Sequence, residues 1–365
     1  MSIGISVYLD LLRAFAAIVV FLVHAADHRL LGGLIPSGAA FASDAVILFF
    51  VLSGVVIASV LDKKDATFER FALSRAARLY SVAIPAIAIT LLFDAIGRHF
   101  DSSLYSNWYP APPEKWVVRI LSPLMFANEF WFHSVRPFSN GPYWSLSYEA
   151  VYYALAAAFC FGSRRLRIGA IVLITLVAGP KIIILFPIWL SGFIVYHYRN
   201  WLSPEWAVVL FYASIGIYAA YIFAGRPFLP SLTIEGYSWS SKALEWSAIG
   251  LCTAVNIWSA TTLLSRRSFP IPSYPIRWIA GRSFSIYAYH YPLQFAVGAV
   301  MPGPPENLFR GVLLVVISFL LCLLAAEFTE LRKDSVRKLL VRGVSRWRKW
   351  FGREKRGVWR SGEPQ

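Results

Sequence analysis

The sequence predicts an all-α integral membrane protein with about ten transmembrane helices and both termini in the cytoplasm. Of its 365 residues, 57% are hydrophobic and only 15% are charged, and the mean hydropathy is +0.56. Soluble domains are about 45–50% apolar and about 25% charged, so this composition favours a chain that crosses a membrane repeatedly. The 14 tryptophans and 18 tyrosines suit the aromatic belts at membrane interfaces.

Ten apolar runs provide these helices, since about 17–25 residues cross the hydrocarbon core. The segment "AGPK" separates two of the runs and leaves two possibilities open, a tight turn between short spans or a kink in one long helix. The predicted spans are residues 5–26, 41–61, 79–97, 142–162, 166–180, 182–198, 206–224, 244–264, 278–300 and 311–330.

The distribution of lysine and arginine predicts the orientation of these spans. With both termini inside, the cytoplasmic segments hold 24 of these residues and the outer segments hold nine, in line with the positive-inside rule. Twelve of the 24 lie in residues 331–365, a basic cytoplasmic tail after a membrane domain of residues 1–330. Such a tail is typical of an anchor to anionic lipids, so the net charge of +15 does not indicate a nucleic-acid partner.

One long connection, residues 98–141, is predicted to lie outside the membrane. Its many aromatic residues indicate order, because disordered segments contain few of them. We expect it either to fold over the outer face as a lid or to lie in the interface as a re-entrant segment. Five of its aromatic side chains could stack on sugar rings or simply anchor the segment: Tyr105, Trp108, Tyr109, Trp116 and Trp131.

The first span, "LLRAFAAIVVFLVHAADHR", carries an arginine and a histidine. Arg13 and His24 are 11 residues apart, which places them on one helix face, about 16 Å apart along the axis. A charge inside a membrane costs about 3 kcal/mol or more and normally faces a protein interior or a wet cavity. We therefore expect this helix to line a cavity, with Arg13 near the inner side, beside Asp10, and His24 near the outer side.

The predicted orientation places His24, Glu149 and His290 at similar depths on three different spans. Each of them alone could be a buried polar residue of the core. Three titratable groups at one level favour a functional cavity, so these are the candidate catalytic residues. Tyr287 shares a helix face with His290 and is a further site candidate.

Arg75 and Arg78 share one helix face at the inner end of the third span. Guanidinium groups bind phosphates through paired hydrogen bonds, so this pair could hold an anionic nucleotide at the membrane surface. A positively charged topological anchor is the other interpretation that the sequence allows.

Together these segments resemble the acyltransferase-3 family of bacterial membrane acyltransferases. They occur in the order that is typical of the family and cover most of residues 5–300. The matching segments are "LDLLRAFAAIVVFLVHA", "ILFFVLSGVVIA", the Arg75 and Arg78 pair before "LYSVAIPA", "WSLSYEAVYY" and "SFSIYAYHYPL".

The resemblance implies an enzyme of the bacterial inner membrane that moves an acyl group, usually acetyl, from cytoplasmic acyl-CoA to an acceptor hydroxyl. The acceptor is commonly a sugar that is handled at the outer face. The expected partners are therefore acyl-CoA, a carbohydrate or glycosylated acceptor and membrane lipids, and no metal or bound cofactor is expected.

The resemblance also implies roles for individual residues. His24 matches the essential histidine of the first helix, and Arg13 matches its arginine partner. Arg75 and Arg78 match the paired arginines that engage the acyl donor. Three residues fall in the family's tryptophan-to-glutamate motif, and a fourth resembles its late histidine: Trp144, Ser147, Glu149 and His290.

One position departs from the family pattern. Many relatives carry an acidic residue just before the paired phenylalanines, where this chain has Ile47. Asp44 lies one turn upstream and is a further site candidate.

The chemistry of the transfer predicts a base with a pKa near neutrality, which histidine supplies. We expect His24 to act as this base, with Glu149 or His290 orienting it or sharing the proton. Direct transfer and a covalent acyl-histidine intermediate both remain open. A transporter or flippase of a glycan or lipid-linked sugar is the rival function, and an inactive scaffold is another, but neither explains five motifs in order.

Overall fold

The computed structural model describes residues 2–36, 38–62, 67–109, 113–226, 231, 236, 238–265 and 273–358. Within these ranges the regular elements are helices, and no strand occurs among them. The predicted all-α fold is therefore confirmed.

Six helical stretches of the described chain are long and apolar enough to cross a membrane, as in a multi-pass membrane protein. Four of them have an N-cap residue whose side chain accepts a hydrogen bond from the backbone N–H three residues further along the chain. These N-cap residues are Ser2, Thr67, Ser203 and Asn307. The stretches are α1 (Ile3–Ala25), α3 (Ala39–Leu61), α4 (Phe68–Phe100), α8 (Pro180–Ile183) with α9 (Phe186–His197), α10 (Pro204–Phe223), and α14 (Leu308–Phe328) with the start of α15 (Lys333–Val358).

Four other predicted spans fall on α6 (Ser145–Phe161), α7 (Arg164–Ala178), α11 (Ala243–Leu263) and α13 (Ser283–Val300). That these helices also cross the membrane stays a prediction, as does the orientation of the chain. The remaining elements are α2 (His28–Leu31), η1 (Ser103–Tyr105), α5 (Pro113–Leu124), η2 (Gly141–Trp144), η3 (Ser238–Lys242), α12 (Ser273–Ala280) and η4 (Glu330–Arg332).

The segment "AGPK" forms a turn between two helices. Gly179 has a φ of +85°, which ends α7 before Pro180 starts α8. A Cβ atom on Gly179 would lie 2.7 Å from the Cα atom of Trp131, and the Trp131 N–H donates to the carbonyl of Ala178 over 2.9 Å. The glycine is therefore required both for the turn and for the contact with the connection of residues 98–141.

The predicted span 278–300 is wrong at its start. The chain there forms the end of α12, and α13 begins only at Ser283. Gly281 and Arg282 make the turn between the two helices, and the Arg282 side chain bonds Glu327 and the carbonyl of Trp278. A glycine next to a bonded arginine thus interrupts an apolar run that composition alone joins into one helix.

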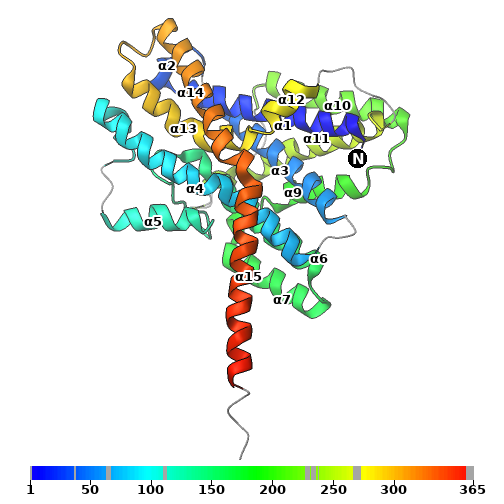
Figure 1. The fold of residues 1–365 in the computed structure, drawn as a ribbon. Coiled ribbons are helices and arrows are strands. Elements are labelled where there is room, and N and C mark those ends of the chain that lie inside the picture. The colour runs from blue at the N-terminus through cyan, green and yellow to red at the C-terminus, as the bar shows by residue number, and fades with distance from the viewer. Residues whose placement is uncertain are drawn as a thin grey trace, which may run out of the picture.

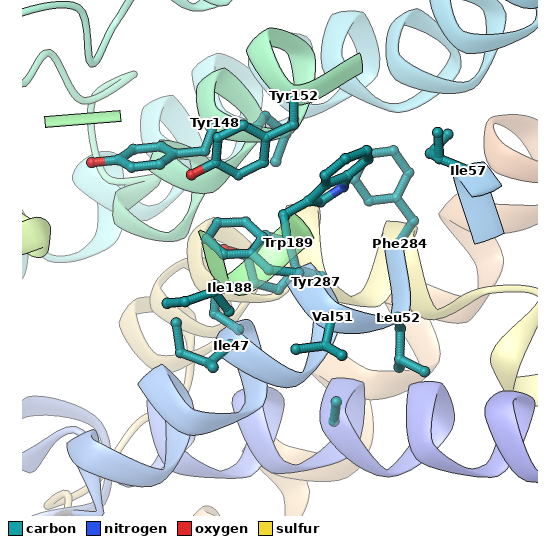
Figure 2. Close-up of a cluster of buried hydrophobic side chains, with 14 of the residues drawn as sticks. Ile47, Val51, Leu52, Ile57, Tyr148, Tyr152, Ile188, Trp189, Phe284 and Tyr287 are labelled. Carbon is teal, nitrogen blue, oxygen red and sulfur yellow. The ribbon is translucent and has the colours of Figure 1, made fainter. Parts of the chain in front are cut away.

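The centre of the bundle is α3, which packs against α1, α9 and α11. Two glycines bring α3 and α9 into backbone contact: a Cβ atom on Gly54 would overlap the carbonyl oxygen of Trp189, and one on Gly192 would overlap that of Val51. Small residues commonly allow this close packing between membrane helices. Figure 2 shows the adjoining cluster, where large side chains from α3, α6, α9 and α13 meet around Trp189.

The connection of residues 98–141 is ordered where it is described and folds against α4 and α13. Asp94, buried in α4, accepts hydrogen bonds from the hydroxyls of Ser139 and Tyr109 over 2.5 and 3.1 Å. Trp108 packs edge-on against Phe295 of α13, with ring centroids 4.9 Å apart. The connection therefore covers one end of these helices as an ordered segment.

The basic tail is helical for most of its length. Figure 1 shows α15 leaving the bundle after α14 and extending beyond the other helices. Its first part packs against α4, the helix that carries Arg75 and Arg78. This contact places the start of the tail beside the predicted donor site.

Candidate active site

A cavity of about 230 Å³ collects the three predicted donor-binding arginines, Arg13 of α1 and Arg75 and Arg78 of α4. Glu149 and Tyr153 of α6 form another part of its wall. We call this the arginine cavity. Its lining contains five cationic and two acidic side chains, so its field attracts anions.

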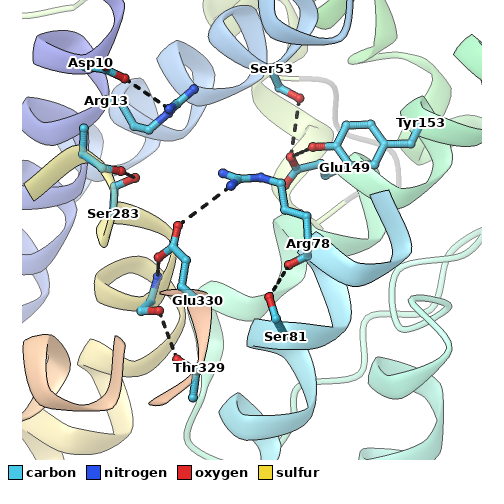
Figure 3. A network of polar contacts seen from close by, with 12 residues as sticks. Asp10, Arg13, Ser53, Arg78, Ser81, Glu149, Tyr153, Ser283, Thr329 and Glu330 are labelled. Atoms are coloured by element: carbon cyan, nitrogen blue, oxygen red, sulfur yellow. Dashed lines mark hydrogen bonds and ion pairs between the residues drawn. The ribbon is translucent and has the colours of Figure 1, made fainter. Parts of the chain in front are cut away.

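Each arginine is held by a different contact. Arg13 pairs with Asp10 over 3.5 Å, as the sequence predicts. Arg78 extends between Glu149 and Glu330 (Figure 3), and its Nη1 lies 3.9 Å from the Glu330 carboxylate. Arg75 donates to the Ser74 hydroxyl over 3.0 Å, while its buried Nε has no partner among the described residues. An unpaired buried donor of this kind is costly unless a ligand accepts from it.

Glu149 lies in this arginine cavity. Its carboxylate accepts from the Ser53 hydroxyl over 3.4 Å and from the Tyr153 hydroxyl (Figure 3). Neither histidine of the predicted catalytic group lines the cavity. The expectation that Glu149 shares one cavity with His24 and His290 is therefore wrong, because depth along a helix does not fix the direction in which a side chain points.

The start of α15 completes the rim of the arginine cavity with Lys333, Asp334 and Arg337. All three side chains are exposed. From the sequence these charges are expected only in a lipid anchor, so their position at the rim was missed. Their spacing over one helical turn after an apolar span is the signal that could have placed them at a site mouth.

His24 of α1 and His290 of α13 form a direct pair, with His24 Nδ1 3.0 Å from His290 Nε2. Nδ1 of His290 lies 3.0 Å from the carbonyl of Ile286, which can only accept, so this nitrogen carries the proton. Nε2 of neutral His290 is then an acceptor, and Nδ1 of His24 must donate to it, sharing its proton with the carbonyl of Val20 at 2.9 Å.

This hydrogen-bond pattern leaves Nε2 of His24 as the unprotonated ring nitrogen. Among the described residues it has no hydrogen-bond partner, and His24 lines a second cavity with Asp27 and His28. Its lone pair is available to take a proton or attack a carbonyl.

An ion pair lies next to this histidine, at the start of α2. Asp27 binds Arg29 over 2.7 Å, and the Tyr291 hydroxyl contacts both, at 3.4 and 3.3 Å. Burial alone would raise the pKa of the Asp27 carboxyl, but the hydrogen bonds from Arg29 outweigh burial, so this pKa lies below its ordinary value. Asp27 therefore stays ionised and cancels part of the arginine charge.

Tyr287 separates the arginine cavity from the histidine pair. Its hydroxyl lies 2.7 Å from that of Ser145 and donates to the carbonyl of Pro142 over 2.6 Å. Its ring lines the cavity, and the ring centroid lies 6.3 Å from that of His290. Tyr287 therefore lies between the lining of the arginine cavity and His290.

The other site candidates lie outside both groups. Asp44 is buried and bonds Arg226 and Tyr218, whose hydroxyl donates to it over 2.6 Å. Trp144 stacks on Trp246 in the core, with ring centroids 5.9 Å apart.

Ser147 is fully buried and donates to the side-chain carbonyl of Asn128 over 2.6 Å. Asn128 belongs to the connection of residues 98–141, so this bond fixes the connection to α6. Asp44, Trp144 and Ser147 therefore have structural contacts here, and none of them lines the arginine cavity.

Comparisons with known proteins identify the family of this chain. The sequence model of the family described as "Acyltransferase domain" matches residues 6–327. Peptidoglycan O-acetyltransferase OatA of Listeria monocytogenes is 24% identical over 372 residues, covering 88% of this chain and 54% of that protein. The chain thus spans about half the length of this relative. No solved structure matches the chain. Because the family match covers most of the chain, the protein belongs to the acyltransferase-3 family of membrane acyltransferases.

Proposed function

We propose that this protein is an O-acetyltransferase of the bacterial inner membrane that uses cytoplasmic acetyl-CoA as its donor. Its acceptor is a hydroxyl of a carbohydrate or glycosylated molecule at the outer face. The observation that carries the proposal is that α1 brings Arg13 to the arginine cavity and, further along, carries His24, whose Nε2 has no hydrogen-bond partner among the described residues. The name of the Listeria relative, a peptidoglycan O-acetyltransferase, supports the acyl group and the acceptor class.

In this proposal the arginine cavity binds the phosphate-bearing part of the donor. Arg75 and Arg78 supply planar donors that match phosphate oxygens, and the unpaired Nε of Arg75 gains an acceptor. A volume of about 230 Å³ is below the range of about 300–1,000 Å³ for drug-sized ligands, so the cavity holds only part of the donor. The exposed cations Lys333 and Arg337 at the rim contact the part that remains outside.

The acetyl group then has to reach His24. Arg13 and His24 are about 16 Å apart along α1 by helical rise, so an extended thioester arm is the part of the donor that spans the distance. Arg13 lies at the start of this path and steadies the carbonyl groups of the arm or the developing oxyanion. Tyr287 lies beside the path and has to yield for the arm to pass.

The transfer step uses the free nitrogen of His24. Nε2 of His24 takes the proton of the acceptor hydroxyl while the hydroxyl oxygen attacks the thioester carbonyl. The carbon–sulfur bond breaks, the thiolate takes the proton from His24, and the products are the O-acetyl ester and free coenzyme A. His290 holds the Nδ1 proton of His24 in place, so it is a positioning residue in this scheme.

Inside-out membrane vesicles test this proposal, because they expose the cytoplasmic face to added acetyl-CoA labelled in its acetyl group. We expect alkali-labile label in the saccharide fraction with the natural protein and with His197→Ala, an exposed histidine of α9. His24→Ala should leave no label there. Label-free saccharide in all samples, together with movement of an unmodified glycan across the vesicle, would favour the transporter instead.

A further inference from the structure

A third cavity, of about 740 Å³, lies beside the histidine pair and is formed mainly by the connection of residues 98–141. Its described lining includes four cationic side chains, Arg29, Lys115, Arg119 and Arg136, and no acidic one. We call it the basic cavity. Like charges gathered in one cavity repel one another and create a strong positive potential, which a bound anion relieves.

Contacts within the fold hold two of these cations in place. Arg119 donates to the carbonyl of Trp108 over 2.9 Å. Arg29 lies over the rings of Trp108 and Phe295, at 5.0 and 4.6 Å from their centroids. Asp27 occupies Nε and Nη2 of Arg29, whereas its buried Nη1 has no partner among the described residues. This unmet donor belongs to a side chain that lines the basic cavity.

Aromatic side chains lie next to these charges; Tyr291 is partly exposed, Trp108 keeps a small exposed surface, and Phe138 is fully buried behind them. Trp108, Phe138 and Tyr291 all line the basic cavity. Phe138 is held at a φ of +52°, a left-handed conformation that a non-glycine residue rarely adopts. Backbone strain of this kind persists only where the surrounding structure fixes the residue.

The basic cavity adjoins the proposed base. Tyr291 belongs to its wall, and the Tyr291 ring centroid lies 5.2 Å from that of His24. The ion pair of Asp27 and Arg29 also connects the two cavities, because Asp27 lines the cavity of His24 and Arg29 lines the basic cavity. A molecule bound in the basic cavity therefore lies next to Tyr291 and Arg29, the side chains that border the His24 site.

We propose that the basic cavity binds the carboxylate or phosphate group of an acidic saccharide, and that this saccharide is the acyl acceptor. The proposal rests on the acyl-transfer function and names the chemical class of its acceptor. Four cations match an anionic substituent, and the aromatic side chains match sugar rings. A phospholipid headgroup would use the charge but would leave the aromatic side chains without a role.

Binding of two matched glycosides tests this proposal without any acyl donor. The protein is placed in nanodiscs of phosphatidylcholine, and the dissociation constants of p-nitrophenyl β-glucuronide and p-nitrophenyl β-glucoside are measured by saturation-transfer NMR. We expect the glucuronide to bind about tenfold more tightly, because only it carries a carboxylate for the cations. Equal affinities, or no binding of either glycoside, would overturn the proposal.

Three variants of cavity residues and one control variant separate charge from folding. Lys115→Gln changes an exposed side chain, and Arg119→Gln removes a second charge, so each should reduce the preference for the glucuronide several-fold. Arg119→Lys should keep most of that preference. Lys242→Gln, a cation paired with Glu245 away from the cavity, should leave it unchanged. An unchanged preference in both Gln variants would contradict the proposed site.

Two controls distinguish a saccharide site from a lipid site and from a failure of donor binding. If phosphatidylglycerol in the nanodisc abolishes glucuronide binding, and Lys115→Gln reduces retention of that lipid, the cavity is a lipid site and the proposal is wrong. Acetyl-CoA binding is measured separately and without glycoside. Loss of donor binding alone would contradict the proposed function, whereas loss of the glucuronide preference alone would contradict this inference.

Discussion

His24 and His290 are joined by a hydrogen bond of 3.0 Å between Nδ1 of the first and Nε2 of the second. The bond connects helices that lie far apart in the sequence and gives the two histidines unequal roles. Only His24 keeps an unprotonated nitrogen without a partner among the described residues. His290 uses both of its ring nitrogens within the protein.

This inequality predicts different effects of two substitutions. His24→Ala should lower kcat for acetyl transfer by about a hundredfold or more, since it removes the base. His290→Ala should lower kcat less, because His24 loses only the bond that orients it. Both variants should keep the affinity for acetyl-CoA. Steady-state kinetics would contradict these roles if His290→Ala were the more damaging change.

The position of α15 at the rim of the arginine cavity predicts that its charges affect donor binding. Arg337→Gln removes an exposed cation from the rim of the arginine cavity and should weaken acetyl-CoA binding about threefold to fivefold at low salt. The effect should fade as salt is raised, because exposed charges are screened. Lys338→Gln changes the next residue of α15, which does not line the cavity. Equal losses in the two variants would show a general effect of tail charge.

The contact between α3 and α9 predicts a defect in stability. Gly192→Ala places a methyl group against the carbonyl of Val51 and should lower the free energy of unfolding by about 1–3 kcal/mol. Gly169→Ala is the control, because nothing lies within 4 Å of its Cβ position in α7. It should be neutral or slightly stabilising. Thermal unfolding in detergent compares them, and equal midpoints would contradict the close packing.

A buried ion pair fixes the connection of residues 98–141 to the bundle. Lys181 and Glu129 are 2.7 Å apart, with both side chains fully buried. Lys181→Met should cost about 3–5 kcal/mol, because it leaves the carboxylate unpaired, and adding Glu129→Leu should restore part of this loss.

Unfolding of the single and double variants in denaturing detergent measures this coupling. Lys242→Met is the matched control, since Lys242 and Glu245 form a more exposed pair 3.7 Å apart. It should cost less than about 1 kcal/mol. Additive effects of the two buried substitutions would mean that the pair contributes nothing specific.

Much of the fold could be predicted because the length of an apolar run directly limits where a membrane helix begins and ends. The sequence allows the turn at Gly179 as one of two possibilities, whereas the break at Gly281 could not be predicted, because the neighbouring Arg282 bonds Glu327 far along the chain. The sequence does bring Arg13, Arg75 and Arg78 toward one site, and it places His24 and His290 at one level. The position of a residue along its membrane helix is enough to predict the depth of these two histidines.

The predictions that were wrong at the site depend on the direction in which a side chain points and on its contacts with distant segments of the chain. Glu149 faces the arginines because its helix face meets α3 and α4, and a sequence pattern of one helix does not reveal its neighbours. Asp44 pairs with Arg226, which lies far along the chain. Lys333 and Arg337 were missed because charges at a site mouth and charges at a lipid surface look alike in sequence.

The central claim is that acetyl-CoA binds in the arginine cavity, and equilibrium binding to the purified protein in nanodiscs tests it most directly. The natural protein and Arg165→Gln, an exposed arginine of α7, should bind with equal affinity. Arg75→Gln/Arg78→Gln should bind about a hundredfold more weakly with an unchanged thermal unfolding midpoint. Unaltered affinity in this double variant, or no binding by the folded natural protein, would contradict the claim.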